Sequence, residues 1–209
     1  MSNENRKILQ VFMTIFLVTS ATTKASDELI SFGVRPSTTE AQIGDSIIFD
    51  VLVKDERSVP LGIVSAYVDL HFPADRLELV PGSVIFGPKF GENATHGTGT
   101  PGLVDETGSL IAGLLDAPPL PAPVGIEAEV LFSAEFVAVA TGESMLTTDM
   151  VDLFPRHATT LLGIDDAVGV DAMRFGHAVV KVVPEPSSAA SLSLLLLAFG
   201  SYLAKREDR

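Results

Sequence analysis

Three long segments of the sequence alternate apolar and polar residues with a period of two, and this pattern constrains the fold more than any other feature. The segments are 46–53, 63–72 and 127–140. Because successive side chains of a β-strand point to opposite faces, such alternation predicts strands that bury one face. Shorter stretches of this kind lie at 29–34, 77–79, 145–148 and 173–183. Between 26 and 183 no segment has a helical period, so the sequence predicts an all-β fold, an antiparallel β-sandwich.

The alternation also predicts which residues face the core. In 46–53 the apolar residues share one face, which carries Ile47, Phe49, Val51 and Val53. In 127–140 one face carries Val130, Phe132, Ala134, Phe136 and Ala138. The residues of 63–72 expected to point outward are Ser65, Tyr67, Asp69 and His71. In the last strand, the residues expected in register are Phe175, Val179 and Val183.

The middle of the chain lacks this alternation. Residues 86–102 are rich in Gly, Pro and Thr, and predict a long loop. Thr107 and Gly108 lie between two short strand-like stretches, and predict a hairpin turn. Four prolines within 117–123 predict a rigid, extended connector.

The N-terminus has the layout of a secretory signal peptide. Arg6 and Lys7 precede an apolar run of 11 residues, 8–18, and small residues follow it. Ala21 or Ala25 is the expected cleavage point, so residues 1–25 are assigned to the signal peptide. The alternative is a buried N-terminal helix.

The C-terminus combines a turn-forming motif, an apolar run and a basic end. Pro184 and Pro186 flank Glu185 and hold the motif extended. The following run, 189–204, is uncharged and predicts an apolar helix. Its 16 residues are fewer than the roughly 20 that cross a bilayer comfortably. The basic residues expected to hold the tail on the cytoplasmic side are Lys205, Arg206 and Arg209.

Residues 184–209 resemble the PEP-CTERM sorting signal of Gram-negative bacteria. The resemblance implies that Pro184, Glu185 and Pro186 form the processing motif for an exosortase-type membrane peptidase. It also implies export, a transient stay in the inner membrane through the transmembrane helix, and delivery to the cell surface or extracellular matrix. An ordinary C-terminal anchor and a eukaryotic lipid-anchor signal are the alternatives.

Between these ends, residues 26–183 suffice for one domain with a sizeable core. The chain has 27 acidic and 14 basic residues, a net charge of −13, which disfavours nucleic acid as a partner. It has no cysteine, so an exported form would rely on burial of apolar side chains rather than on disulfides.

Three stretches of the body resemble the cohesin-type jelly-roll sandwich: 41–46, 68–79, and 131–136 followed by 141–144. The resemblance extends over roughly residues 30–183. It implies binding of a dockerin-type protein partner through one sheet face, or of a polysaccharide, as in related carbohydrate-binding sandwiches. The chain has no Trp and two Tyr, so aromatic stacking on a polysaccharide has little support.

Motifs for catalysis are sparse. Residues 97–102 match GxGxxG, but Pro101 removes an amide donor and a strand-like stretch follows, so we favour a flexible loop over a dinucleotide site. The histidines, at 71, 96, 157 and 177, lack the paired spacing of a zinc site. Neither a GxSxG motif nor a cysteine nucleophile is present. A non-catalytic exported protein is therefore expected, and a hydrolase is disfavoured.

Calcium is the one cofactor that the sequence suggests. Five aspartates in loop-like sequence offer oxygen ligands: Asp149, Asp152, Asp165, Asp166 and Asp171. Their spacing differs from an EF-hand, so the site would be weak. The alternative is a solvated acidic loop.

Overall fold

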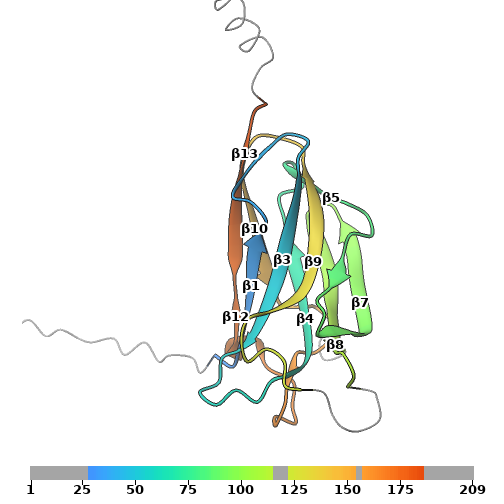
Figure 1. The fold of residues 1–209 in the computed structure, drawn as a ribbon, viewed down its shortest axis with the longest axis vertical. Coiled ribbons are helices and arrows are strands. Elements are labelled where there is room, and N and C mark those ends of the chain that lie inside the picture. Colours follow the sequence, from blue (N-terminus) through green and yellow to red (C-terminus); the bar gives the residue numbers. More distant parts are fainter. Residues whose placement is uncertain (1–27, 115–121, 154–156, 186–209) are drawn as a thin grey trace, which may run out of the picture.

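The computed structural model describes residues 28–114, 122–153 and 157–185. They form two β-sheets packed face to face (Figure 1). Sheet A contains, in spatial order, β12 (Met173–Phe175), β1 (Ile30–Pro36), β3 (Ser46–Asp55), β9 (Glu129–Ala138) and β5 (Leu77–Leu79), with β6 (Ile85–Phe86) also paired to β9.

Sheet B contains β2 (Glu40–Gln42), β13 (His177–Val183), β10 (Gly142–Asp149), β4 (Ile63–His71), β8 (Leu103–Ile111) and β7 (Phe90–Thr100), with β11 (Thr160–Leu161) also paired to β4. Neighbouring strands are antiparallel except at two edges, where β12 runs parallel to β1 and β2 runs parallel to β13. Within the described residues the helical structure is one 3₁₀ turn, η1 (Val170–Ala172). The prediction of an all-β sandwich is confirmed.

The core lies between the two sheets, as the alternation of apolar and polar residues predicts. The inward side chains of β3 are fully buried. Phe136 of β9 packs edge-on against Phe49 of β3 and Phe72 beyond β4, with ring centroids 5.5 and 4.9 Å apart. On β9 a bulge shifts the register, because Val51 pairs with Phe132 and Leu52 with Val130. The bulge buries Leu131 and leaves Val130 half-buried, unlike the expected alternation.

The prediction of a loop over 86–102 is wrong for most of its length. Residues 90–100 form β7, which pairs with β8 as the edge strand of sheet B. Its register shifts twice, and Gly91, Asn93 and Gly97 have positive φ angles. An irregular edge strand needs no apolar alternation, so its sequence carries little strand signal.

The predicted hairpin at Thr107 and Gly108 is also wrong. Both residues lie inside β8, and the turn is at Pro101 and Gly102. A Cβ on Gly108 would lie 2.2 Å from the carbonyl oxygen of Ala66 on the neighbouring strand. The glycine therefore permits a close approach of two strands rather than a turn.

Two predictions of side-chain direction had different outcomes. Ser65, Tyr67 and Asp69 do point away from the core, as predicted, but they are at most 6% exposed, and residues 157–160 pack over Ser65 and Tyr67. On β13 the inward residues are instead Ala178, Val180 and Val182, and Val179 is 43% exposed. Gly176 separates β12 from β13, and thus breaks the alternation that was expected to continue from Phe175.

Both predicted export signals lie largely outside the described residues. Residues 1–27 and 186–209 are not described, so the signal peptide, Pro186, the apolar run and the basic end have no structural account. Pro184 and Glu185 directly follow β13. Of the proline-rich connector, Ala122 and Pro123 are described. In the described part of the chain, no helix has the length and apolar character needed to cross a bilayer.

Candidate functional site

The outer face of sheet B gathers side chains from segments far apart in the sequence. We call the outer surface of β13, β10, β4 and β8 the sheet B face. The strand register places Thr147 of β10 between His71 of β4 and His177 of β13. His157 lies above the same sheet, with its ring stacked on Tyr67 at a centroid distance of 4.9 Å. Three of the four histidines, which are far apart in the sequence, thus lie on one face of the fold.

An apolar pair occupies the β10–β13 part of this face. Met145 and Val179 are direct cross-strand partners, and they are 54% and 43% exposed. Next to them in the same strands, Thr147 and His177 also face outward. The result is a small exposed apolar spot with polar neighbours.

A compact polar cluster occupies the β4–β8 part of the face. Asp69 of β4 lies opposite a bulge formed by Asp105 and Glu106 of β8. Glu106 has a φ of 56°, and its backbone N–H donates to Asp69 Oδ1 at 2.7 Å. The Glu106 carboxylate contacts His157 Nδ1 and accepts the Leu153 N–H at 2.7 Å. Glu106, which is 5% exposed, is thus held from both sides.

The environment of Asp69 favours the protonated carboxyl group. Its burial, together with the neighbouring charges of Asp105 and Glu106, raises the pKa to about 6, against the lowering effect of the Glu106 N–H. Ligand oxygens of these three residues lie within 4.8 Å of one another.

Hydrogen bonds that involve side-chain hydroxyl groups connect the segment around β11 to β4. Ser65 Oγ donates to the carbonyl oxygen of Ala158 at 2.7 Å and contacts Thr160 Oγ1 at 2.7 Å. The Tyr67 N–H donates to Thr159 Oγ1 at 3.2 Å. At the border of this covered zone, Leu153 is 49% exposed. The sheet B face therefore combines a covered polar zone with exposed apolar side chains beside it.

The five aspartates of the calcium hypothesis do not form a cluster of their own, although Asp149 is the cross-strand partner of Asp69. Asp149 ends β10, 3.9 Å from His71 Nε2, and its carboxylate accepts the Met150 N–H. The other four are exposed, and Asp171 belongs to η1. No three of the five converge as potential metal ligands in the described structure, where the group that does is Asp69, Asp105 and Glu106. Calcium binding at the five aspartates stays a prediction.

The GxGxxG string lies in β7 and in the turn that leads to β8. A dinucleotide site of that type needs a helix N-terminus at the motif, to meet the pyrophosphate. Here a strand follows instead. The motif therefore has a structural role in an edge hairpin.

No protein-family model matches the chain, and no curated protein matches it significantly in sequence. Solved structures do match. The seventh ScaB type I cohesin from Pseudobacteroides cellulosolvens aligns with a TM-score of 0.53 and 16% identity, covering 75% of this chain and 93% of the cohesin. The fold is cohesin-like. A chain of a type I cohesin–dockerin complex from Clostridium thermocellum aligns with a TM-score of 0.50 and 11% identity, covering 74% of this chain and 95% of its own length.

Sequence reasoning missed most of the sheet B face. Met145 and Val179 gave no signal, because their pairing depends on the register of two strands. Glu106 and His157 lie 51 positions apart, and only the fold brings them into contact. The outward position of Asp69 was predictable from the alternation, but its burial was not.

Proposed function

We propose that this chain is an exported, non-catalytic protein-interaction module that binds a dockerin-type protein partner through the sheet B face. The observation that carries the proposal is the cohesin-like fold, which nearly spans the matched cohesin. The Clostridium match comes from a complex of a cohesin with a dockerin. The local resemblance to cohesins of 41–46, of 68–79, and of 131–136 followed by 141–144 points the same way.

The sheet B face suits a partner better than the outer face of sheet A does. On sheet A, Arg35 pairs with Asp50 at 2.8 Å, and Asp50 also accepts from Ser133. Lys54 likewise pairs with Glu56 at 2.9 Å. These charges satisfy one another within the chain. The outer face of sheet A also exposes Ile48, but the sheet B face presents two adjoining apolar side chains, Met145 and Val179, with acidic residues nearby, so a partner with an apolar contact and a basic rim complements it.

The terminal segments are proposed to export and sort the module. Cleavage after Ala21 or Ala25 would remove the signal peptide, and processing at Pro184, Glu185 and Pro186 would remove the apolar tail. The end of β13 at Val183 supports this, because cleavage directly after it removes no described strand. The protein would then remain at the cell surface or in the extracellular matrix.

The binding proposal is tested by retention of extracellular proteins of the native host on the immobilised full chain. Wild type is compared with Met145→Glu on the sheet B face, and with the control Ile48→Glu. Ile48 is 48% exposed on the outer face of sheet A, so the control adds the same charge at a matched exposure. We expect a host protein retained by wild type and control but lost with Met145→Glu. Equal retention by all three would refute the assignment of the face, and retention on insoluble polysaccharide alone would favour a carbohydrate ligand.

A further inference from the structure

Two histidines and an aspartate lie together on three adjacent strands of the sheet B face. Thr147 of β10 pairs with His71 of β4 on one side and with His177 of β13 on the other. Asp149, two residues after Thr147 in β10, lies diagonally across from His71. The two histidines and Asp149 are exposed. Imidazole nitrogens and a carboxylate oxygen are ligands that suit zinc and similar divalent ions.

His71 and Asp149 already have nearly the separation of two ligands of one ion. His71 Nε2 and Asp149 Oδ2 lie 3.9 Å apart, too far for a hydrogen bond. Two atoms that each lie about 2.1 Å from one tetrahedral ion are roughly 3.4 Å from each other, so a small movement places an ion between them. The other oxygen of Asp149 accepts the Met150 N–H at 2.7 Å. This bond orients the carboxylate, as outer-shell hydrogen bonds orient metal ligands.

His177 is placed to be the third ligand. Neighbouring strands are about 4.8 Å apart, so the backbones of His71 and His177 flank Thr147 at a separation of roughly 10 Å. The threonine side chain is short, and two imidazole rings can lean toward each other above it. The three ligand groups do not converge within 4.8 Å in the described part of the chain, so binding requires the exposed His177 ring to turn. Exposed side chains change rotamer within nanoseconds, so this movement is accessible.

The charge around these three residues favours a cation. Asp149 is the cross-strand partner of Asp69, and Asp105 and Glu106 lie next to Asp69. The sequences of β4, β8 and β10 contain neither lysine nor arginine. The whole chain has a net charge of −13. A divalent ion is therefore attracted to this part of the face, and no basic side chain on these strands opposes it.

We propose that His71, His177 and Asp149 bind Zn²⁺ or a similar divalent transition-metal ion, with water as the fourth ligand. The site differs from the calcium hypothesis, which combines Asp149 with other aspartates, because calcium takes oxygen ligands rather than imidazole nitrogen. The ion lies beside the Met145–Val179 pair, where a bound partner can replace the water. Binding of the ion itself needs no partner, so the inference stands or fails independently of the proposed function.

The test is isothermal titration of the full chain, without a histidine tag, with zinc chloride and with calcium chloride. We expect saturable binding of one zinc ion per chain. Calcium should bind more weakly and should not displace zinc at equal concentration, because the site contains two imidazole ligands. No saturable binding of zinc, or displacement of zinc by an equal concentration of calcium, would overturn the proposal.

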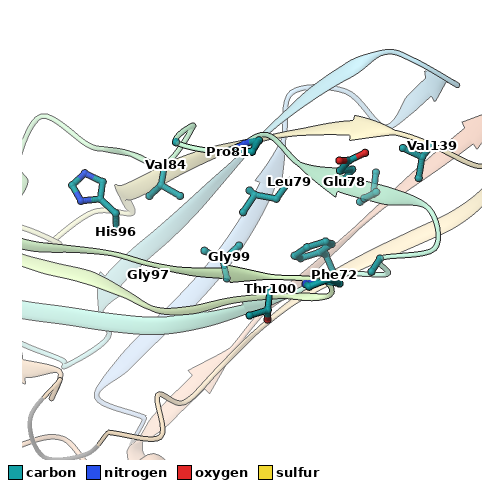
Figure 2. Close-up of a pocket in the computed structure, with 15 residues that line it drawn as sticks. Phe72, Glu78, Leu79, Pro81, Val84, His96, Gly97, Gly99, Thr100 and Val139 are labelled. Atoms are coloured by element: carbon teal, nitrogen blue, oxygen red, sulfur yellow. The ribbon is translucent and has the colours of Figure 1, made fainter.

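Single substitutions of histidine locate the ion. Loss of an outer-shell partner lowers metal affinity by about 10- to 100-fold, and loss of a direct ligand costs at least as much, so His71→Asn and His177→Asn should each lower zinc affinity by about tenfold or more. The matched control is His96→Asn, which should leave the affinity unchanged. His96 is also exposed, but it lies at one end of a cavity of about 700 Å³ between β5 and β7 (Figure 2). There its ring packs edge-on against Phe86, with centroids 5.2 Å apart.

Two aspartate variants separate this site from the neighbouring acidic cluster. Asp149→Asn should lower zinc affinity, and Asp105→Asn should change it less than His71→Asn does. Zinc should also raise the thermal unfolding midpoint of wild type and of His96→Asn, but not that of His71→Asn, because an ion that binds the folded state stabilises it. Zinc affinity that survives both His71→Asn and His177→Asn, or that falls as much with Asp105→Asn, would overturn the assignment.

Discussion

Asp69→Asn is expected to make the protein more stable at neutral pH while changing its stability little in acid. Asp69 is 6% exposed, and its burial beside Asp105 and Glu106 raises the pKa to about 6 from the ordinary 3.8. Because the folded pKa lies above the unfolded one, the stabilising contribution of Asp69 is complete below pH 3.8 and is lost as the pH rises through 6. Asparagine retains an oxygen to accept the Glu106 N–H, but cannot ionise.

The size of the effect follows from the two pKa values. Their difference corresponds to at most about 3 kcal/mol of unfolding free energy. Between pH 4 and pH 7.5, the stability of Asp69→Asn relative to wild type should therefore rise by up to about 3 kcal/mol. Because both proteins are measured at both pH values, the contributions of titrating groups that the substitution does not affect cancel in the difference of unfolding free energies.

The assay is urea unfolding of the full chain by linear extrapolation at both pH values. Asp75→Asn is the control, because the Asp75 side chain is 73% exposed in a turn. Its difference from wild type should change less between the two pH values than that of Asp69→Asn. A difference between Asp69→Asn and wild type that is equal at both pH values would refute the account of this cluster.

Three further predictions concern other parts of the molecule. Asp55→Ala should cost about 3–5 kcal/mol in urea unfolding, because Asp55 is 1% exposed and binds the Arg57 guanidinium at 2.6 Å and the N–H groups of Leu61 and Gly62. A loss below 1 kcal/mol would contradict this. Burial raises the Asp55 pKa, but the bonds from Arg57 and Gly62 outweigh it and lower the pKa overall, so this stabilisation is lost at low pH. Gly108→Ala should destabilise by about 1–3 kcal/mol through overpacking against Ala66, and unchanged thermal unfolding would disprove the close approach. Calorimetric titration with calcium should show weak binding near millimolar concentration at the five aspartates, and the absence of heat would dismiss that hypothesis.

The strands with strong alternation were predictable from sequence because their two faces meet different environments. In β3 each inward residue is buried against the other sheet, and because the outward residues are not, the sequence alternates with a period of two. The strand β7 was not predictable, because an edge strand with bulges needs neither alternation nor apolar residues. The prediction of a hairpin turn at Gly108 was wrong because glycine occurs both in turns and where two strands approach closely.

The candidate sites depended on information that a single sequence does not hold. The Met145–Val179 pair arises from the register between β10 and β13. The burial of Tyr67 involves His157 and Thr159, which lie in a stretch whose sequence gave no secondary-structure signal. Such long-range contacts decide which outward-pointing residues are available to a ligand.

The intact mass of the protein recovered from its native host tests most directly whether the sandwich is the part that acts outside the cell. The account predicts an extracellular or surface form that begins after Ala21 or Ala25 and ends between Pro184 and Ser187. A full-length chain of 209 residues recovered from the cytosol would contradict it.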